Sequence, residues 1–140
     1  MDLKTLNNIC KNTMIDHLGI EFTEIGENHI IATMPVDNRT IQPMKRLHGG
    51  ASMALAETIG SAGSLAILNS KDFMVLGVEI SGSHVASTNE SEVKATGTLV
   101  YQGKARHVWE IRIEDKNRKL LSICRLTNSI LPVKNKEDNA

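Results

Sequence analysis

Aromatic side chains are scarce in this chain of 140 residues, which contains one Trp, one Tyr and two Phe. A surface that stacks nucleobases needs several aromatic rings, so this composition argues against a binder of single-stranded nucleic acid. An excess of charge of one sign is also missing, because 16 Lys and Arg balance 16 Asp and Glu. No overall field therefore attracts nucleic acid or anionic lipid, and we expect neither nucleic acid nor membrane among the partners.

Cysteine is equally sparse. Cys10 and Cys124 lie far apart, without the CxxC or Cys/His spacing of metal ligands. This pattern is typical of two reduced thiols in a cytosolic protein, and it predicts no metal site. The first eight residues lack the apolar segment of a signal peptide. The segment Ala51–Asn69 is almost long enough to cross a membrane, but its Gly, Ser, Thr and Glu residues favour a buried helix. We therefore expect a soluble, cytoplasmic protein.

The hydrophobic periodicity predicts a single α+β domain over residues 1–140, with a flexible tail over about 134–140. A short amphipathic helix is expected over Leu3–Met14, and a long buried helix over Ala51–Asn69. Alternating apolar residues predict strands over Gly19–Ile25, His29–Val36, Phe73–Ser87, Glu92–Tyr101, Arg106–Glu114 and Leu120–Leu131. A helix that is apolar on nearly all sides needs cover around most of its circumference. We expect an antiparallel sheet that curves around this helix, or a second copy that completes the cover.

Glu57 is the only charged residue in the predicted long helix. On a helix with about 3.6 residues per turn, it shares one face with Ser61 and Ser64, beside Gly60. A carboxylate that is buried without a partner is costly, so this position calls for an explanation. Either the two hydroxyls bond helix carbonyls and Glu57 bonds a neighbouring strand, or this face is a working site.

The segment before the helix contains Gln42 and ends in His48, Gly49 and Gly50. The two glycine amides would lie at the positive end of the helix, which favours an oxyanion or a polarised carbonyl. Taken alone, the histidine is more typical of a turn residue and the glutamine indicates nothing. Together with a helix carboxylate and a hydroxyl that holds water, these residues predict an acyl-transfer or hydrolysis site.

The predicted helix places the carboxylate far from these amides. Glu57 follows Gly50 by seven residues, so its Cα lies on the order of 10 Å further along the axis. A reacting carboxylate must come within about 3–3.5 Å of the carbonyl carbon. A second subunit, whose helix runs antiparallel across a two-fold axis, can bring its own glutamate that close. The sequence therefore predicts a site shared between subunits.

Other polar residues rank lower as site candidates. His84 falls near the end of a predicted strand, where it either faces a ligand or is a polar residue at a strand edge. Lys104, Arg106 and His107 follow the turn at Gly103 and either meet phosphate groups or are solvated. The sequence contains no GxSxG elbow, no phosphate-binding loop, no GxGxxG motif and no cluster of metal ligands.

The segments Met34–Pro43 and Leu47–Ser61 closely resemble the hotdog-fold acyl-CoA thioesterases of the phenylacetate-degradation type. Within them, the chain is most similar to the branch that contains dihydroxynaphthoyl-CoA hydrolase and the enterobactin-pathway proofreading thioesterase. The resemblance covers roughly residues 18–131. It implies a hotdog fold, in which the curved sheet wraps around the central helix, and a homodimer that assembles into a homotetramer.

The resemblance also implies roles for individual residues. Glu57 would be the catalytic carboxylate, acting as nucleophile or as general base on water. From the other subunit, Gln42 and His48 would orient the thioester, and the Gly49 amide would polarise its carbonyl. Ser61 would assist the water. No cofactor is implied, because coenzyme A is part of the substrate.

Substrate contacts follow from the same resemblance. Ala62 would line the acyl pocket near His84, and its small side chain suits an aryl ring, although helix packing explains it as well. The three basic residues after Gly103 occupy the region in which relatives hold the coenzyme A phosphates. Close relatives have an arginine two residues after the matched histidine, where this chain has Ala86.

Several functions stay open at this point. The first is hydrolysis of an aromatic acyl-CoA, of aryl or dihydroxynaphthoyl type, the latter implying menaquinone biosynthesis. The second is a hotdog protein that binds acyl-CoA without turnover, against which the intact Gln42, His48 and Glu57 speak. A proofreading thioesterase that acts on acyl groups held by a carrier protein is a further alternative. A hotdog dehydratase fits the order of these motifs poorly.

Overall fold

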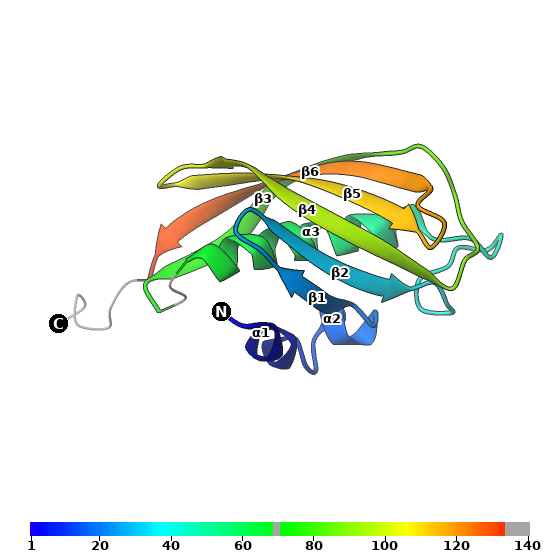
Figure 1. Ribbon diagram of the computed structural model, residues 1–140, viewed down its shortest axis with the longest axis horizontal. Helices are drawn as coiled ribbons and strands as arrows, with labels where there is room; N and C mark the ends of the chain where they lie inside the picture. Colours follow the sequence, from blue (N-terminus) through cyan, green and yellow to red (C-terminus); the bar gives the residue numbers. More distant parts are fainter. Residues whose placement is uncertain (69–70, 134–140) are drawn as a thin grey trace.

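The computed structural model describes residues 1–68 and 71–133. In chain order its elements are α1 (Leu3–Ile9), α2 (Met14–His17), β1 (Glu21–Ile25), β2 (His29–Pro35), α3 (Gly49–Ile67), β3 (Phe73–His84), β4 (Glu92–Gln102), β5 (Arg106–Asp115) and β6 (Leu120–Pro132). The strands form one antiparallel sheet in the order β1-β2-β4-β5-β6-β3. The sheet curves over α3 (Figure 1), so the predicted α+β architecture is confirmed.

The helix α3 is held against the sheet by an apolar face of small and branched residues. Leu55 and Ile59 are fully buried, and α3 contacts five strands, β2 to β6. Gly63 allows an especially close approach, because a Cβ there would lie 2.6 Å from the ring of Trp109. A glycine inside a helix costs about 1 kcal/mol relative to alanine. Here it is required by the packing of the ring on the helix.

The N-terminal segment differs from the prediction. The single helix expected over Leu3–Met14 is wrong, because the chain forms α1, a turn and then α2. Asn12 has a positive φ of 61°, and the Thr13 hydroxyl accepts a hydrogen bond from the Ile15 amide and so begins a new helix. The side chain of Asn7 bonds both the N–H and the C=O of Phe22 and thereby docks α1 on β1.

The strand β3 forms an open edge of the sheet. It pairs with β6 on one side, and its side chains are largely exposed in the single chain. Met74, Leu76 and Val78 are 46%, 45% and 55% exposed. A long apolar edge strand of this kind is a template for pairing with another chain.

Smaller differences concern the ends of the elements. The helix α3 begins at Gly49, two residues before the predicted start, and β3 ends at His84 and not at Ser87. The predicted helix end at Asn69 and the predicted flexible tail over 134–140 lie outside the described residues. Within the part of the chain that the structure describes, no helix is both long and apolar enough to cross a membrane.

Candidate functional site

Backbone hydrogen bonds join the two halves of the loop between β2 and α3. Ile41 and Leu47 form an isolated antiparallel bridge. The Gln42 amide donates to the Arg46 carbonyl at 2.9 Å, and the His48 amide donates to the Thr40 carbonyl at 2.8 Å. The backbone of this loop is therefore held in place before α3 begins.

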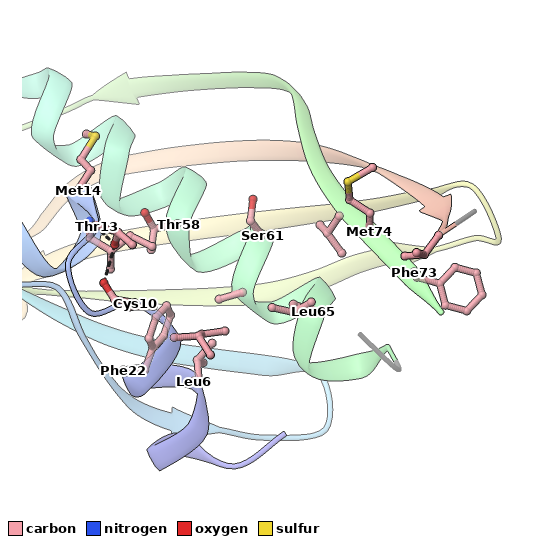
Figure 2. A pocket seen from close by; sticks show the side chains of 15 residues that line it. Leu6, Cys10, Thr13, Met14, Phe22, Thr58, Ser61, Leu65, Phe73 and Met74 are labelled. Atoms are coloured by element: carbon pink, nitrogen blue, oxygen red, sulfur yellow. Dashed lines mark hydrogen bonds between the residues drawn. The ribbon is translucent and has the colours of Figure 1, made fainter. Parts of the chain in front are cut away.

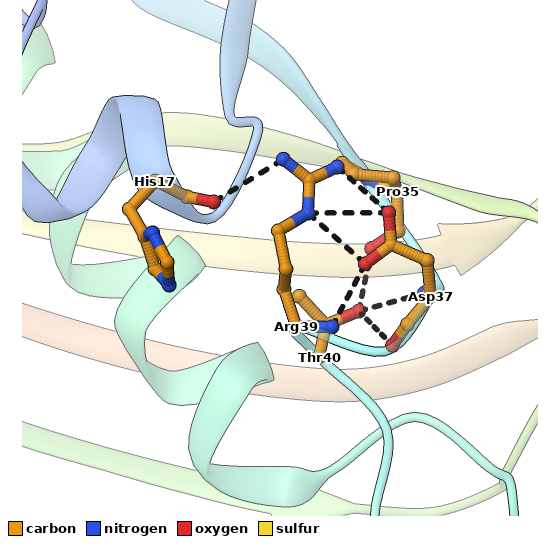
Figure 3. Close-up of polar contacts among 5 residues, drawn as sticks. All are labelled: His17, Pro35, Asp37, Arg39 and Thr40. Carbon is orange, nitrogen blue, oxygen red and sulfur yellow. Dashed lines mark hydrogen bonds and ion pairs between the residues drawn. The ribbon is translucent and has the colours of Figure 1, made fainter.

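Hydrogen bonds from Arg39 and Thr40 anchor the same loop to the rest of the molecule (Figure 3). The Arg39 guanidinium donates to the Asp37 carboxylate, with its shortest contact at 2.7 Å, and reaches the His17 carbonyl at 3.2 Å. The Thr40 hydroxyl donates to the Pro35 carbonyl at 2.7 Å. Hydrogen bonds from Arg39 lower the pKa of the Asp37 carboxyl to about 2. The loop is thus clamped to β2 and to the end of α2.

His48 is the N-cap residue of α3. Its Nδ1 accepts a hydrogen bond from the Gly50 amide at 2.7 Å, so the neutral ring carries its proton on Nε2. This corrects the expectation of two free amides, because the Gly50 N–H is already used. The Gly49 N–H has no hydrogen-bond partner among residues 1–68 and 71–133. A single amide at the positive end of α3 is therefore available to a carbonyl oxygen.

His84 lies beside Gly49. A Cβ on Gly49 would be 2.8 Å from the His84 Nε2, and the His84 Nδ1 is 2.8 Å from the Ser122 hydroxyl. These residues line a cavity of about 140 Å³, together with Ser52 and Ala86 among others. The structure therefore brings the predicted His84 to the start of α3.

Gln42 lies in the adjoining loop. Its Oε1 accepts a hydrogen bond from the Met44 amide. The opposite end of the side-chain amide, the Nε2 donor, has no partner in the described part of the chain. Because the carbonyl end is fixed, the two N–H groups of Nε2 are available to donate to a substrate oxygen.

Glu57 lies about two helical turns away from the Gly49 amide, on an exposed part of α3. Its Oε1 would be 2.6 Å from a Cβ on Gly77 of β3. Within the described residues its carboxylate makes no hydrogen bond or ion pair, so the alternative in which Glu57 bonds a neighbouring strand is not observed. Gly77 and His84 are separated by seven residues of strand, about 20 Å. One chain therefore keeps its carboxylate away from its own Gly49 amide.

Ser61 and Ser64 belong to a polar network between α3 and the sheet. The Ser64 hydroxyl accepts from Trp109 Nε1 at 2.9 Å and from Asn128 Nδ2 at 2.9 Å. It lies 3.0 Å from His107 Nδ1. Ser61 donates to Asn128 Oδ1 at 3.3 Å. The two hydroxyls therefore form hydrogen bonds with side chains of the sheet. The hydrogen bonds to helix carbonyls, which one of the two interpretations of the sequence predicted, are not observed among the described residues.

His107 requires a correction. The sequence placed it among residues that could meet coenzyme A phosphates, but its side chain is 1% exposed and bonded to Ser64. Burial lowers the pKa of the His107 imidazole, which favours the neutral ring. A neutral, enclosed imidazole does not suit a phosphate ligand, so His107 is a core residue.

Lys104 and Arg106 are exposed, as a phosphate contact requires. Lys104 lines a hollow of about 540 Å³ that also includes Phe73 and Gln102. Arg106 is tethered to the sheet, because its guanidinium donates to the Ser129 hydroxyl at 2.8 Å. Neither side chain lines the cavity at Gly49, so the structure of one chain does not bring them to the predicted oxyanion site.

A larger cavity of about 710 Å³ lies between α3, β3 and the N-terminal helices (Figure 2). Ala62 and Ser61 line it, together with mainly apolar residues such as Leu6 and Phe22. Ala62 was expected near His84, yet His84 lines the separate small cavity at Gly49. In a single chain the two residues line separate cavities, His84 beside the start of α3 and Ala62 further along the helix, so their proximity stays a prediction for the site shared between subunits.

Cys10 also lines the larger cavity, and its thiol is a chemical group that can act as a nucleophile. Burial raises the pKa of its thiol, which disfavours the reactive thiolate. Both cysteines are free. Within residues 1–68 and 71–133, no group of three or more His, Cys, Asp or Glu side chains could hold a metal ion. Glu57 thus remains the candidate for acid–base or nucleophilic chemistry.

Asn128 is the residue that the sequence analysis missed. It lies on the inner face of β6, is fully buried, and contacts Gly60, Ser61 and Ser64. A signal for it exists in the strand, because an asparagine interrupts the apolar alternation between Leu126 and Ile130. A polar residue at such a position needs buried partners.

The known proteins to which this chain is similar include several thioesterases. A family profile described as the thioesterase superfamily matches residues 44–122. The chain is 41% identical over 132 residues to the proofreading thioesterase EntH of Cronobacter turicensis, covering 94% of this chain and 95% of that protein. It is 40% identical over 129 residues to the 1,4-dihydroxy-2-naphthoyl-CoA hydrolase of Escherichia coli, covering 92% and 94%.

The solved structures agree with these relatives. A thioesterase from Haemophilus influenzae matches with a TM-score of 0.92 at 40% identity, over 97% of this chain and 94% of that one. A mutant thioesterase from Pseudomonas aeruginosa matches with a TM-score of 0.92 at 36% identity, over 95% and 96%.

Proposed function

Because the chain belongs to the thioesterase superfamily, we propose that it hydrolyses an aromatic acyl-CoA to the free acid and coenzyme A. The predicted resemblance to hotdog-fold thioesterases is confirmed, and the chain is a thioester hydrolase. The alternatives of a non-catalytic binder and of a dehydratase are therefore set aside. The observation that carries the proposal is the unpaired Gly49 amide at the start of α3, beside His84.

The working unit in this proposal is a homodimer built across β3. The apolar edge of β3 supports it, because pairing with a second copy would cover Met74, Leu76 and Val78. Antiparallel pairing also runs the two α3 helices in opposite directions. Glu57 of the partner subunit then approaches the Gly49 amide, which its counterpart in the same chain does not reach. Two such dimers would form the homotetramer that the resemblance implies.

The chemistry follows from the groups at this shared site. The thioester oxygen accepts hydrogen bonds from the Gly49 N–H and the Gln42 Nε2–H, which polarise the carbonyl. Glu57 of the partner subunit takes a proton from water, and the hydroxide adds to the carbonyl carbon. The C–S bond then breaks, and the sulfur leaves as coenzyme A thiolate and takes up a proton. Direct attack by the carboxylate is the alternative route.

The large cavity supports an aromatic acyl group. Its apolar lining and its volume of about 710 Å³ leave room for one or two rings. The small Ala62 side chain and Ser61 lie on its α3 wall. We propose that Lys104 and Arg106, both exposed, contact the coenzyme A phosphates from the surface.

Two features bear on the setting of the reaction. Free Cys10 and Cys124 suit a reducing compartment, and we propose the cytoplasm, where coenzyme A thioesters are available. The identity to the 1,4-dihydroxy-2-naphthoyl-CoA hydrolase supports a dihydroxynaphthoyl-type substrate and a role in menaquinone biosynthesis. The identity to the proofreading thioesterase supports a second candidate, an acyl group carried on a carrier protein.

One screen tests the function. Thiol release is measured with aryl, dihydroxynaphthoyl, short-chain and long-chain acyl-CoAs, and with acyl-carrier-protein thioesters. We expect the highest kcat/KM for an aromatic acyl-CoA. Higher values for the carrier-protein thioesters would favour the second candidate, and a preference for long alkyl chains would contradict the aromatic assignment.

The catalytic role of Glu57 is tested in the same assay. Glu57→Gln should lower kcat by roughly a thousandfold or more, because the base is removed while the shape is kept. The matched control is Glu21→Gln on β1, which alters another exposed carboxylate and should leave kcat unchanged. Near-normal turnover by Glu57→Gln would exclude this carboxylate from the mechanism.

A further inference from the structure

We propose that Asn128 is a positioning residue that fixes the Ser61 hydroxyl as a hydrogen-bond acceptor toward the attacking water. This inference rests on the proposed function, in which Glu57 activates water at the same face of α3. Asn128 touches neither substrate nor water, and it acts through Ser61. The proposal stands on five hydrogen bonds of the network and on the direction of each proton.

The orientation of the Asn128 amide is determined by its neighbours. Its Nδ2 donates to the Gly60 carbonyl at 3.0 Å and to the Ser64 hydroxyl at 2.9 Å. A flipped amide would place an oxygen against the Gly60 carbonyl, which has no proton to offer. Oδ1 must therefore face Ser61, whose Oγ is 3.3 Å away.

Ser64 reinforces this orientation. Its oxygen accepts from Trp109 Nε1 and from Asn128 Nδ2, and these two bonds occupy both lone pairs. Its own proton is then directed to His107 Nδ1 at 3.0 Å, so that nitrogen is the acceptor. All of these side chains apart from Ser61 are buried, where an unmade hydrogen bond is costly. The network therefore has one consistent set of proton positions.

The consequence lies at Ser61. Its single proton is committed to Asn128 Oδ1, so toward the cavity the oxygen offers lone pairs alone. Ser61 projects from α3 into the large cavity (Figure 2), one turn beyond Glu57. A water molecule between the two donates one proton to Glu57 and the other to Ser61. Its lone pairs are then free to point at the carbonyl carbon.

A serine that donated its proton to the water would have the opposite effect. It would occupy a lone pair that the water needs for attack on the thioester. Asn128 excludes this state because it holds the serine proton on the sheet side of the helix. The sheet thereby sets the direction of a hydrogen bond in the active site.

A double-mutant cycle tests this assignment. The variants are Asn128→Leu, Ser61→Ala and the double variant, and kcat, KM and the melting temperature are measured for each. We expect Asn128→Leu to lower kcat by about tenfold with KM nearly unchanged. In the Ser61→Ala background the same change should leave kcat unaltered, because its target is gone. An equal loss of kcat in both backgrounds would overturn the proposal.

Trp109→Phe is the matched control. It removes a different hydrogen bond to Ser64 and leaves the Gly60 and Ser61 contacts of Asn128 in place. The Gly60 carbonyl alone fixes the orientation of the Asn128 amide, so Trp109→Phe should lower the melting temperature and keep kcat. A loss of kcat as large as that of Asn128→Leu would mean that any loosening of this core slows the reaction, and would overturn a specific role for Asn128.

A second measurement does not depend on activity or on the folding of any variant. In the wild-type protein, the Asn128 side-chain NH₂ group should exchange with solvent far more slowly than those of exposed asparagines, as followed by NMR. Fast exchange would overturn the locked amide. A wild-type protein that lacks Glu57-dependent thioester hydrolysis, but retains slow exchange, would instead contradict the proposed function.

Discussion

The Glu57 carboxylate occupies the space that the missing side chain of Gly77 leaves free. A Cβ on Gly77 would stand 2.6 Å from Oε1 of Glu57. Because Gly77 lies on the open edge strand β3, the carboxylate is held at the surface through which a second subunit would pair. Packing against β3 and not ionic pairing sets its position in the single chain. We therefore expect the activity to depend on Gly77, because any side chain at this position would displace the Glu57 carboxylate.

Gly77→Ala should lower kcat by about tenfold with little change in thermal stability. The new methyl group must push the carboxylate aside, and the flexible end of a glutamate can move without disturbing the core. Kinetics of thioester hydrolysis and a thermal melt check both parts. An unchanged kcat would mean that the carboxylate does not need to lie against β3.

A matched control is available at the edge of the same sheet. Gly26→Ala introduces a methyl group against the ring of His29, in the turn between β1 and β2 and away from the proposed site. It should leave kcat unchanged. A similar loss in both variants would point to a general response of the sheet and not to displacement of the carboxylate.

Mixed dimers test the sharing of the site. One protomer carries Glu57→Gln and the other carries His48→Ala, so one of the two sites keeps both groups intact. Each mixed dimer should recover about half of the wild-type kcat, whereas each variant alone is nearly inactive. Recovery is followed by thiol release after the two chains are mixed and allowed to exchange. Absence of recovery in verified mixed dimers would mean that each chain builds its own site.

Much of the architecture could be predicted because the local patterns are strong. The alternation of apolar and polar residues predicted the strands. A long apolar segment with Glu57 as its only charged residue predicted the central helix. The broken N-terminal helix was missed because Leu6, Ile9 and Cys10 continue an apolar stripe up to Thr13, where a side-chain cap restarts the chain. The single hydrogen bond from the Ile15 amide to the Thr13 hydroxyl favours a new helix start over continuation of the first helix. The spacing of apolar residues contains no information about this bond.

The site was predicted in part for a similar reason. Gln42, His48 and Gly49 lie close in sequence to the start of the helix, so a local motif locates them. The contacts of His107 and Asn128 with Ser64 span 43 and 64 residues. They depend on the register of β5 and β6 against α3, which no local pattern contains. His107 was therefore placed on the surface when it belongs to the core.

The Asp37–Arg39 clamp should make stability depend on acid. Hydrogen bonds from Arg39 hold the pKa of Asp37 at about 2, below its ordinary value of 3.8. Because the pKa is lower in the folded protein, the ionised Asp37 carboxylate adds to the free energy of unfolding above about pH 4. This contribution is lost as the pH falls toward 2. The melting temperature of wild type should therefore exceed that of Asp37→Asn at pH 5 and approach it near pH 2. A difference that stays constant over this range would contradict the clamp.

His107 should produce a pH dependence in a different range. Burial lowers the pKa of its imidazole below the ordinary value of 6.5, so the unfolded chain takes up a proton first as the pH falls. Stability should therefore decline as the pH falls below 6.5, where the unfolded histidine becomes charged and the folded one stays neutral. His107→Gln keeps a polar side chain and removes this titration. Melting temperatures between pH 7 and 5 should fall less steeply for His107→Gln than for wild type. Parallel curves would mean that the ring is free to ionise in the folded protein, contrary to its place in the core.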